Sequence, residues 1–282
     1  MRELAFRIVN VFTQNRGPLT GNPLCVFESA AALDTATMQA LARQFNLSET
    51  TFVLPSSRAT AHVRIFTPSY EMPFAGHPTL GTAHVCRTLG LGGNDLKLEM
   101  QAGIIPVRAD GDRWTLQANA PTWRECEASR GTLAKMLGLA ETDIGAEALW
   151  VKAGKEQLVI PLASERAVRS IRPDAATFAG VLSEDGHSMA YVFAELPQSG
   201  RLLSRFFFPS GGAVLEDPAT GSATANLGGW MIATGRKLPC RFEISQGEYT
   251  ARPSTLLLDV DGDGRIFVSG DVVELARGTL RL

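Results

Sequence analysis

The sequence lacks the features that mark membrane, secreted and nucleic-acid-binding proteins. None of its apolar runs approaches the ~18 residues that a helix needs to span a bilayer. The formal net charge is −2, the isoelectric point is near 6.1, and lysines and arginines form no cluster, so we expect no nucleic-acid partner. The first residues contain no apolar signal region, and we therefore expect a cytoplasmic protein with no membrane partner.

Patterns for metal binding and for disulfides are also missing. Three of the four histidines show no ligand spacing: His62, His84 and His187. The segment that starts at Asp259 begins like a calcium loop, but its twelfth residue is Gly270 rather than the glutamate such a loop needs. The cysteines are far apart and form no Cys-x-x-Cys site: Cys25, Cys86, Cys126 and Cys240. We expect no metal, and buried, reduced thiols at Cys25 and Cys86.

What the sequence does contain is an internal repeat. Residues 71–81 and 216–223 both read Glu-x-Pro-x-x-Gly, followed by a polar residue and a run of small residues typical of a helix. Gly221 lies 145 positions after Gly76, which is about half of the 282 residues. A glutamine follows each glycine after 25 residues, and an Asp-Gly hairpin signal follows each glutamine. These coincidences indicate a duplicated unit.

The repeat predicts two similar halves of an α+β fold. Each half is expected to be a curved, mostly antiparallel β-sheet, barrel-like, wrapped around a central helix. Glycine inside a helix costs about 1 kcal/mol relative to alanine, and close approach of surrounding strands would explain the small residues of the two motif helices. The predicted N-terminal half covers residues 1–118 and is completed by 271–282, and the C-terminal half covers 119–270.

The local pattern predicts the order β-β-α-β-β-α-β-β in each half. In the first half, strands are expected over residues 4–12, 24–27, 51–54 and 62–66, and helices over 35–45 and 78–89. In the second, strands are expected over 149–153, 157–162, 189–194 and 203–208, and helices over 173–182 and from 222 to about 234.

Helix starts carry bare backbone N–H groups and bind anions, so Gly76 and Gly221 predict a binding cleft for a carboxylate. Four polar side chains accompany them: Glu49, His77, Asp217 and Ser222. Each also has a structural interpretation. Glu49 could be a solvated loop carboxylate, His77 and Ser222 could be helix caps, and Asp217 could cap the turn before a proline. The catalytic interpretation gains because His77 and Ser222 occupy matching places in the two copies, whereas the loop matching Glu49 has no carboxylate.

Taken together, these motifs resemble the phenazine-biosynthesis isomerase family, the PhzF-like proteins. The resemblance runs nearly end to end and rests on five segments: residues 9–12 (Val-Asn-Val-Phe), 21–27 (Gly-Asn-Pro-Leu-Cys-Val-Phe), 47–50 (Leu-Ser-Glu-Thr), 66–79 and 216–223. It implies the fold of diaminopimelate epimerase, with two pseudo-symmetric halves. It also implies that Glu49 is the catalytic carboxylate, with His77, Asp217 and Ser222 around the substrate, and that the protein is a homodimer.

Related epimerases and racemases place a cysteine just before the glycine of each copy, where this chain has Ala75 and Thr220. Racemisation with two thiols is therefore unsupported. The resemblance implies a cofactor-independent isomerase that moves a proton within a small carboxylate, such as a dihydro-hydroxyanthranilate-like acid. Gly76, Gly221 and Ser222 would bind the substrate, and Glu49, His77 and Asp217 would act on it. The alternatives are a single-base epimerase or a lyase on a related acid, or a non-catalytic protein that binds small acids.

Overall fold

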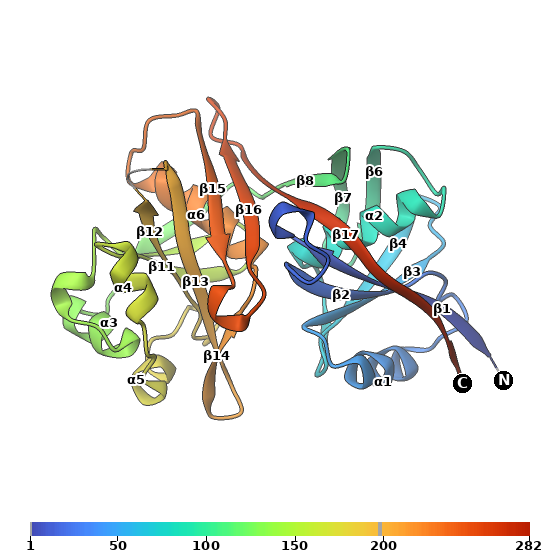
Figure 1. Cartoon of the computed structure of the whole chain (residues 1–282), viewed down its shortest axis with the longest axis horizontal. Helices are drawn as coiled ribbons and strands as arrows, with labels where there is room; N and C mark the ends of the chain where they lie inside the picture. The colour runs from blue at the N-terminus through green and yellow to red at the C-terminus, as the bar shows by residue number, and fades with distance from the viewer. Residues whose placement is uncertain (1, 197–198) are drawn as a thin grey trace. The chain divides into compact units, whose positions relative to one another are not determined.

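The computed structural model describes residues 2–196 and 199–282 and divides into two compact units (Figure 1). Unit 1 contains Met1–Gln117 and Ser269–Leu282, and unit 2 contains Ala118–Val268. None of the helices in the described residues has the length and apolar character that a bilayer crossing requires.

Unit 1 is a closed barrel of eight strands. The barrel follows the order β1-β2-β3-β4-β6-β7-β8-β17 and closes by antiparallel pairing of β17 with β1. The β2–β3 and β4–β6 pairs are parallel, and short β5 pairs with β4. The strands are β1 (Glu3–Val11), β2 (Asn22–Phe27), β3 (Glu49–Leu54), β4 (Ala61–Phe66), β5 (Glu71–Met72), β6 (Asp95–Met100), β7 (Gly103–Asp110), β8 (Arg113–Gln117) and β17 (Ile266–Arg281).

Helix α2 (Gly76–Thr88) forms the core of this barrel and contacts six of its strands. Ten of its thirteen residues are buried. Gly81 shows why small residues are needed, because a Cβ there would lie 2.6 Å from Leu24 Cδ2 and 2.9 Å from Val11 Cγ2. The predicted close approach of the strands to this helix is therefore confirmed.

Helix α1 (Thr35–Phe45) has the predicted bounds. The Asp34 side chain accepts a hydrogen bond from Thr37 N at its start, and Asn46 ends it in the left-handed conformation. Its buried face, which includes Met38, joins the apolar cluster formed by the phenylalanines of β2, β3 and β4.

Unit 2 repeats the strand pairing of unit 1. The succession β10-β11-β12-β13-β15-β16 has the same alternation of antiparallel and parallel pairs as β1-β2-β3-β4-β6-β7, and β14 pairs with β13 as β5 pairs with β4. Strand β9 pairs with β10 as β17 pairs with β1. The strands are β9 (Thr122–Glu125), β10 (Leu149–Lys152), β11 (Glu156–Pro161), β12 (Ala190–Leu196), β13 (Arg201–Ser210), β14 (Ala213–Asp217), β15 (Cys240–Gln246) and β16 (Ser254–Val260).

Helix α6 (Gly221–Ala233) is the counterpart of α2, and ten of its thirteen residues are buried as well. A Cβ at Gly229 would lie 2.7 Å from Val151 Cγ1. Both Asp-Gly hairpin signals are also confirmed: Gly111 and Asp112 connect β7 to β8, and Asp261 N donates to Arg265 O across the second turn.

The remaining helices are short. Two were not predicted, α3 (Arg130–Leu137) and α4 (Glu165–Ser170), and the helix predicted over 173–182 is limited to α5 (Ala175–Ala179). These three pack on an apolar cluster with β10, β11 and β12. Single 3₁₀ turns occur at Gln14–Arg16, Glu141–Asp143 and Glu248–Thr250.

Candidate active site

The motif glutamates are structural in both units. Arg64 forms a bidentate ion pair with Glu71, with nitrogen–oxygen distances of 2.6 and 2.7 Å. Arg205 forms the same pair with Glu216, at 2.7 and 3.1 Å. Each pair joins a barrel strand to the short strand that leads into a motif helix. The Glu of Glu-x-Pro therefore positions the helix start and is not available as a base.

Strand register identifies the counterpart of Glu49. In unit 1 the residue after Glu49 pairs with Phe66, and in unit 2 the residue after Met189 pairs with Phe207. Both phenylalanines pair with the motif glutamate of their own unit. Met189 thus occupies the place of Glu49, and the predicted chemical asymmetry of the two halves is confirmed.

In unit 1, Glu49 and His77 meet at the start of α2. Glu49 is the first residue of β3, and His77 is the second residue of α2. Their side chains are 16% and 7% exposed, and Glu49 Oε2 lies 3.5 Å from His77 Nδ1. A carboxylate and an imidazole therefore lie side by side with little exposure to solvent.

Burial makes His77 a neutral imidazole. Desolvation lowers the pKa of His77 to about 3, and the hydrogen bond to the Pro23 backbone raises it only in part. Among the described residues, the Nε2 atom of His77 has no hydrogen-bond partner although it is buried. Trp114 Nε1 and His84 Nδ1 share this condition, so it does not by itself identify a binding site.

The start of α2 is suited to bind an anion. Its N-cap residue is Ala75, whose side chain offers no oxygen to the first-turn N–H groups of Gly76 and His77. The helix macrodipole places partial positive charge at the same point. A carboxylate bound there would lie beside the pair formed by Glu49 and His77.

In unit 2, the half-buried Asp217 is hydrogen-bonded to two buried polar residues, Thr220 and Gln246, at the start of α6. The Thr220 hydroxyl donates to the Asp217 carboxylate. The Gln246 amide donates to the Asp217 carbonyl at 2.9 Å and to the Thr220 hydroxyl at 3.0 Å. Gln246 is only 2% exposed, so this cluster holds the turn between β14 and α6 in one conformation.

Ser222 is the second residue of α6, the place that His77 has in α2. Its hydroxyl accepts a hydrogen bond from Gln157 Nε2 at 3.1 Å. The N-cap of α6 is Thr220, and no side chain caps it. The interpretation of His77 and Ser222 as plain helix caps is therefore wrong, since both lie inside their helices.

The structure brings together Glu49, His77 and Gly76 within unit 1, and Asp217, Gly221 and Ser222 within unit 2. That all six serve one cleft stays a prediction. Reasoning from the sequence missed three buried polar residues of unit 2: Gln157, Asn226 and Gln246. The repeat held a signal for one of them, because Gln246 ends the interval of 25 residues after Gly221.

The thiols are placed as predicted. Cys25 and Cys86 are buried and reduced, and desolvation raises the pKa of both thiols, that of Cys86 to about 12. Among the described residues, no group of three or more His, Cys, Asp or Glu side chains is arranged to hold a metal ion.

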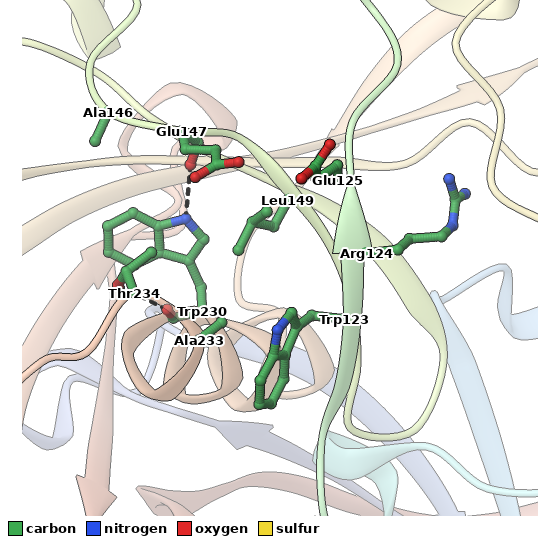
Figure 2. Close-up of a pocket in the computed structure, with 9 residues that line it drawn as sticks. All are labelled: Trp123, Arg124, Glu125, Ala146, Glu147, Leu149, Trp230, Ala233 and Thr234. Atoms are coloured by element: carbon green, nitrogen blue, oxygen red, sulfur yellow. Dashed lines mark hydrogen bonds between the residues drawn. The ribbon is translucent and has the colours of Figure 1, made fainter.

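A surface hollow of about 640 Å³ occurs in unit 2, away from the start of α6 (Figure 2). Its lining includes Trp123, Leu149 and Trp230, whose indole N–H donates to the Glu147 carbonyl. The hollow reaches Thr234, just past the C-terminal end of α6, where the helix macrodipole repels a carboxylate. We therefore place the candidate site at the helix starts and not here.

These features define an α+β protein with the diaminopimelate epimerase-like fold, as predicted. The chain belongs to the phenazine biosynthesis-like protein family (PhzC-PhzF), whose model matches residues 9–278. It is 38% identical over 281 residues to an uncharacterized isomerase of Pasteurella multocida, with 98% of this chain and 93% of that protein covered. It is 36% identical over 295 residues to the trans-2,3-dihydro-3-hydroxyanthranilate isomerase of Pseudomonas chlororaphis, with 98% of each chain covered.

A solved PhzF-family protein of Bacillus anthracis has the same fold, with a TM-score of 0.88, 24% identity and full coverage of both chains. The resemblance predicted from the motifs is confirmed, and the chain is an isomerase.

Proposed function

We propose that this isomerase moves a proton within a small carboxylate, such as a dihydro-hydroxyanthranilate-like acid, with Glu49 as the general base and without a cofactor. The observation that carries the proposal is the nearly buried pair of Glu49 and His77 at the uncapped start of α2. The name of the Pseudomonas chlororaphis relative supports the substrate class.

The substrate carboxylate would bind the first N–H groups of α2, at Gly76 and His77. Their partial positive charge favours an anion, and it favours more strongly the enolate-like charge that develops when the neighbouring C–H loses its proton. Anchoring the acid in this way lowers the barrier to proton abstraction.

Glu49 would take the proton from carbon and return it to another carbon of the allylic system. The double bond shifts, the carboxylate recovers its proton-free form, and the reaction consumes no other reactant. The dry surroundings of Glu49 favour this role, because a desolvated carboxylate is a stronger base. His77 is neutral, so its ring can bind a substrate hydroxyl or amine and relay a proton.

Asp217, Gly221 and Ser222 are proposed to bind or act on polar groups of the same substrate. The cluster with Thr220 and Gln246 supports this role, because it holds Asp217 in one geometry. A fixed donor and acceptor set costs little entropy when a ligand binds.

The test replaces Glu49 with glutamine, which keeps the shape of the side chain and removes its basicity. Proton exchange with deuterated water would be followed by NMR on a dihydro-hydroxyanthranilate-like acid. General-base catalysis contributes about 10²–10⁴-fold, so Glu49→Gln should lose at least that factor in exchange rate while it still binds the acid. Glu3→Gln, at an exposed site of the same barrel, should match the parent.

Exchange by Glu49→Gln at the parental rate would exclude Glu49 as the base and leave His77 or Asp217. The product distinguishes the reaction types: a shifted double bond indicates isomerisation, an inverted centre epimerisation, and loss of water a lyase. Binding without any exchange in the parent would indicate a non-catalytic acid-binding protein.

A further inference from the structure

The hydroxyl of Ser222 is the end of a directional chain of hydrogen bonds through the core of unit 2. We infer that Gln157 and Asn226 are positioning residues that orient Ser222 as a hydrogen-bond donor toward an acceptor oxygen of the substrate, a carboxylate or a carbonyl. This inference deepens the proposed function and rests on it for the identity of the ligand.

The direction of the chain is set by the backbone. Ala153 N donates to Asn226 Oδ1 at 2.7 Å, and a backbone N–H can only donate. The other end of the Asn226 amide must therefore be its Nδ2 group. This assignment agrees with a second backbone contact, because Nδ2 donates to the Lys155 carbonyl at 2.9 Å, and a carbonyl can only accept.

The direction passes from Asn226 to Ser222 through Gln157. Asn226 Nδ2 donates to Gln157 Oε1 at 2.8 Å, so the remaining end of the Gln157 amide is its Nε2 group. That group donates to Ser222 Oγ at 3.1 Å. Because the bond from Gln157 occupies a lone pair of Ser222, the hydroxyl proton points elsewhere and is available to an acceptor.

Burial keeps the chain in this orientation. Asn226 is fully buried and Gln157 is 2% exposed, so water cannot replace a bond that is lost when either amide turns over. Turning an amide would bring like groups together and leave buried donors and acceptors unpaired, which is unfavourable. Ser222 itself is only half-buried, and its outward side can reach a ligand.

Unit 1 shows that the fold does not need this chain. Asn226 is the sixth residue of α6, and the sixth residue of α2 is Gly81. Where Asn226 contacts Gln157 of β11, Gly81 packs against Leu24 of β2, an apolar side chain. Apolar contacts therefore occupy in unit 1 the position that the hydrogen-bond chain occupies in unit 2. In unit 2 this hydrogen-bond chain ends at Ser222.

The test reverses the direction of the hydrogen bond between Gln157 and Ser222. Gln157→Glu keeps the shape but replaces the donor by an oxygen, so the Ser222 hydroxyl would turn inward and donate to the new carboxylate. Binding of anthranilate, a stable aromatic acid, would be measured by calorimetry. We expect Ser222→Ala to weaken binding about 2- to 13-fold, and Gln157→Glu to weaken it by at least the same factor, because the reoriented hydroxyl then presents a lone pair to the acid.

The same replacement in the Ser222→Ala background separates orientation from simple repulsion by the new charge. There, Gln157→Glu should weaken binding by no more than about threefold, because no hydroxyl remains to turn. An equal loss in both backgrounds would overturn the inference, as would a parent that binds no anthranilate. Ser222→Thr keeps the hydroxyl and should retain most of the affinity.

A neutron structure of the deuterated parent provides a readout that needs neither a ligand nor a variant. The deuteron of Ser222 should point away from Gln157, and density for it between the two side chains would overturn the inference. The proposed function is tested separately. If Gln157 variants bind with parental affinity and Glu49→Gln does not exchange protons, the orienting role of Gln157 and Asn226 is refuted, whereas the assignment of Glu49 as the base stands.

Discussion

At the scale of single residues, the candidate base is distinguished by its surroundings and not by its type. Loop carboxylates are usually solvated, but Glu49 begins a barrel strand and lies 3.5 Å from the nearly buried imidazole of His77. The same burial keeps His77 neutral, so that Glu49 faces a hydrogen-bonding ring and not a cation. A neutral neighbour leaves the carboxylate more basic than an imidazolium would.

His77 should make the stability of the protein depend on pH. Its pKa is about 3 in the folded chain and about 6.5 in the unfolded chain, so between these values only the unfolded state takes up a proton. The free energy of unfolding should therefore fall on acidification through this window, by about 1.4 kcal/mol for each pH unit. The contribution of the neutral His77 to the free energy of unfolding is fully present above pH 6.5 and is lost below pH 3.

Urea unfolding at pH 7, 6, 5 and 4.5 would measure this effect, with His77→Gln as the variant that removes it. The variant should lose less stability than the parent as the pH falls. His187→Gln, in an exposed loop, is the matched control and should follow the parent. Parallel curves for His77→Gln and the parent would contradict the burial argument.

At the scale of elements, each motif helix begins where an ion pair fixes the preceding short strand. The two pairs differ in exposure: the side chains of Arg205 and Glu216 are 8% and 11% exposed, and those of Arg64 and Glu71 are 20% and 30% exposed. Arg205 also lies over the ring of Tyr249, with 4.1 Å between the guanidinium carbon and the ring centre. The ion pair of Arg205 and Glu216 is therefore more buried than that of Arg64 and Glu71.

This difference predicts unequal costs for the same substitution. Glu216→Gln leaves a buried guanidinium without its counter-charge and should reduce the free energy of unfolding by about 3–5 kcal/mol. Glu71→Gln leaves a more solvated guanidinium and should cost about 1 kcal/mol. Urea unfolding of both variants would measure the difference, with Glu243→Gln of the exposed pair with Arg201 as a control that changes little. Equal losses at the two motif glutamates would refute this account.

At the scale of the whole molecule, the two ends of the chain complete one barrel. Strand β17 pairs with β1 from Glu3 with Arg281 to Val11 with Val272, and it also pairs with β8. The last residues are thus part of the wall around α2, although more than 150 residues of unit 2 precede them in the sequence. The barrel of unit 1 cannot close without them.

Deletion of residues 271–282 should therefore unfold unit 1. Hydrogen exchange measured by mass spectrometry should show lost protection in α2 and retained protection in α6, because the strands around α6 belong to unit 2. Deletion of residue 282 alone should leave both helices protected. Full protection of α2 in the longer deletion would show that β17 is dispensable.

The predicted homodimer would appear in light scattering as twice the 30.3 kDa mass of one chain.

Elements with a local signal could be predicted from the sequence. Helix α1 was predicted to the residue because Asp34 caps it and its apolar residues repeat with the helical period. The two motif helices followed from the duplicated Glu-x-Pro-x-x-Gly, but the predicted ranges begin at residues 78 and 222, whereas the helices begin at Gly76 and Gly221 and include His77 and Ser222. The register of the strands then confirmed that Glu49 has no carboxylate counterpart.

Contacts between polar side chains that are distant in the sequence could not be predicted and follow from the folding of the strands. Gln157 and Ser222 are 65 positions apart, and Asn226 reaches Lys155 across 71. Each of these residues has an ordinary local sequence, and their contacts exist because the strands of unit 2 wrap around α6. The burial that neutralises His77 has the same origin, since strand closure and not the neighbouring sequence removes the water. Local spacing sets where a helix starts, whereas the desolvation that gives a side chain its chemistry depends on segments that only the closed barrel brings together.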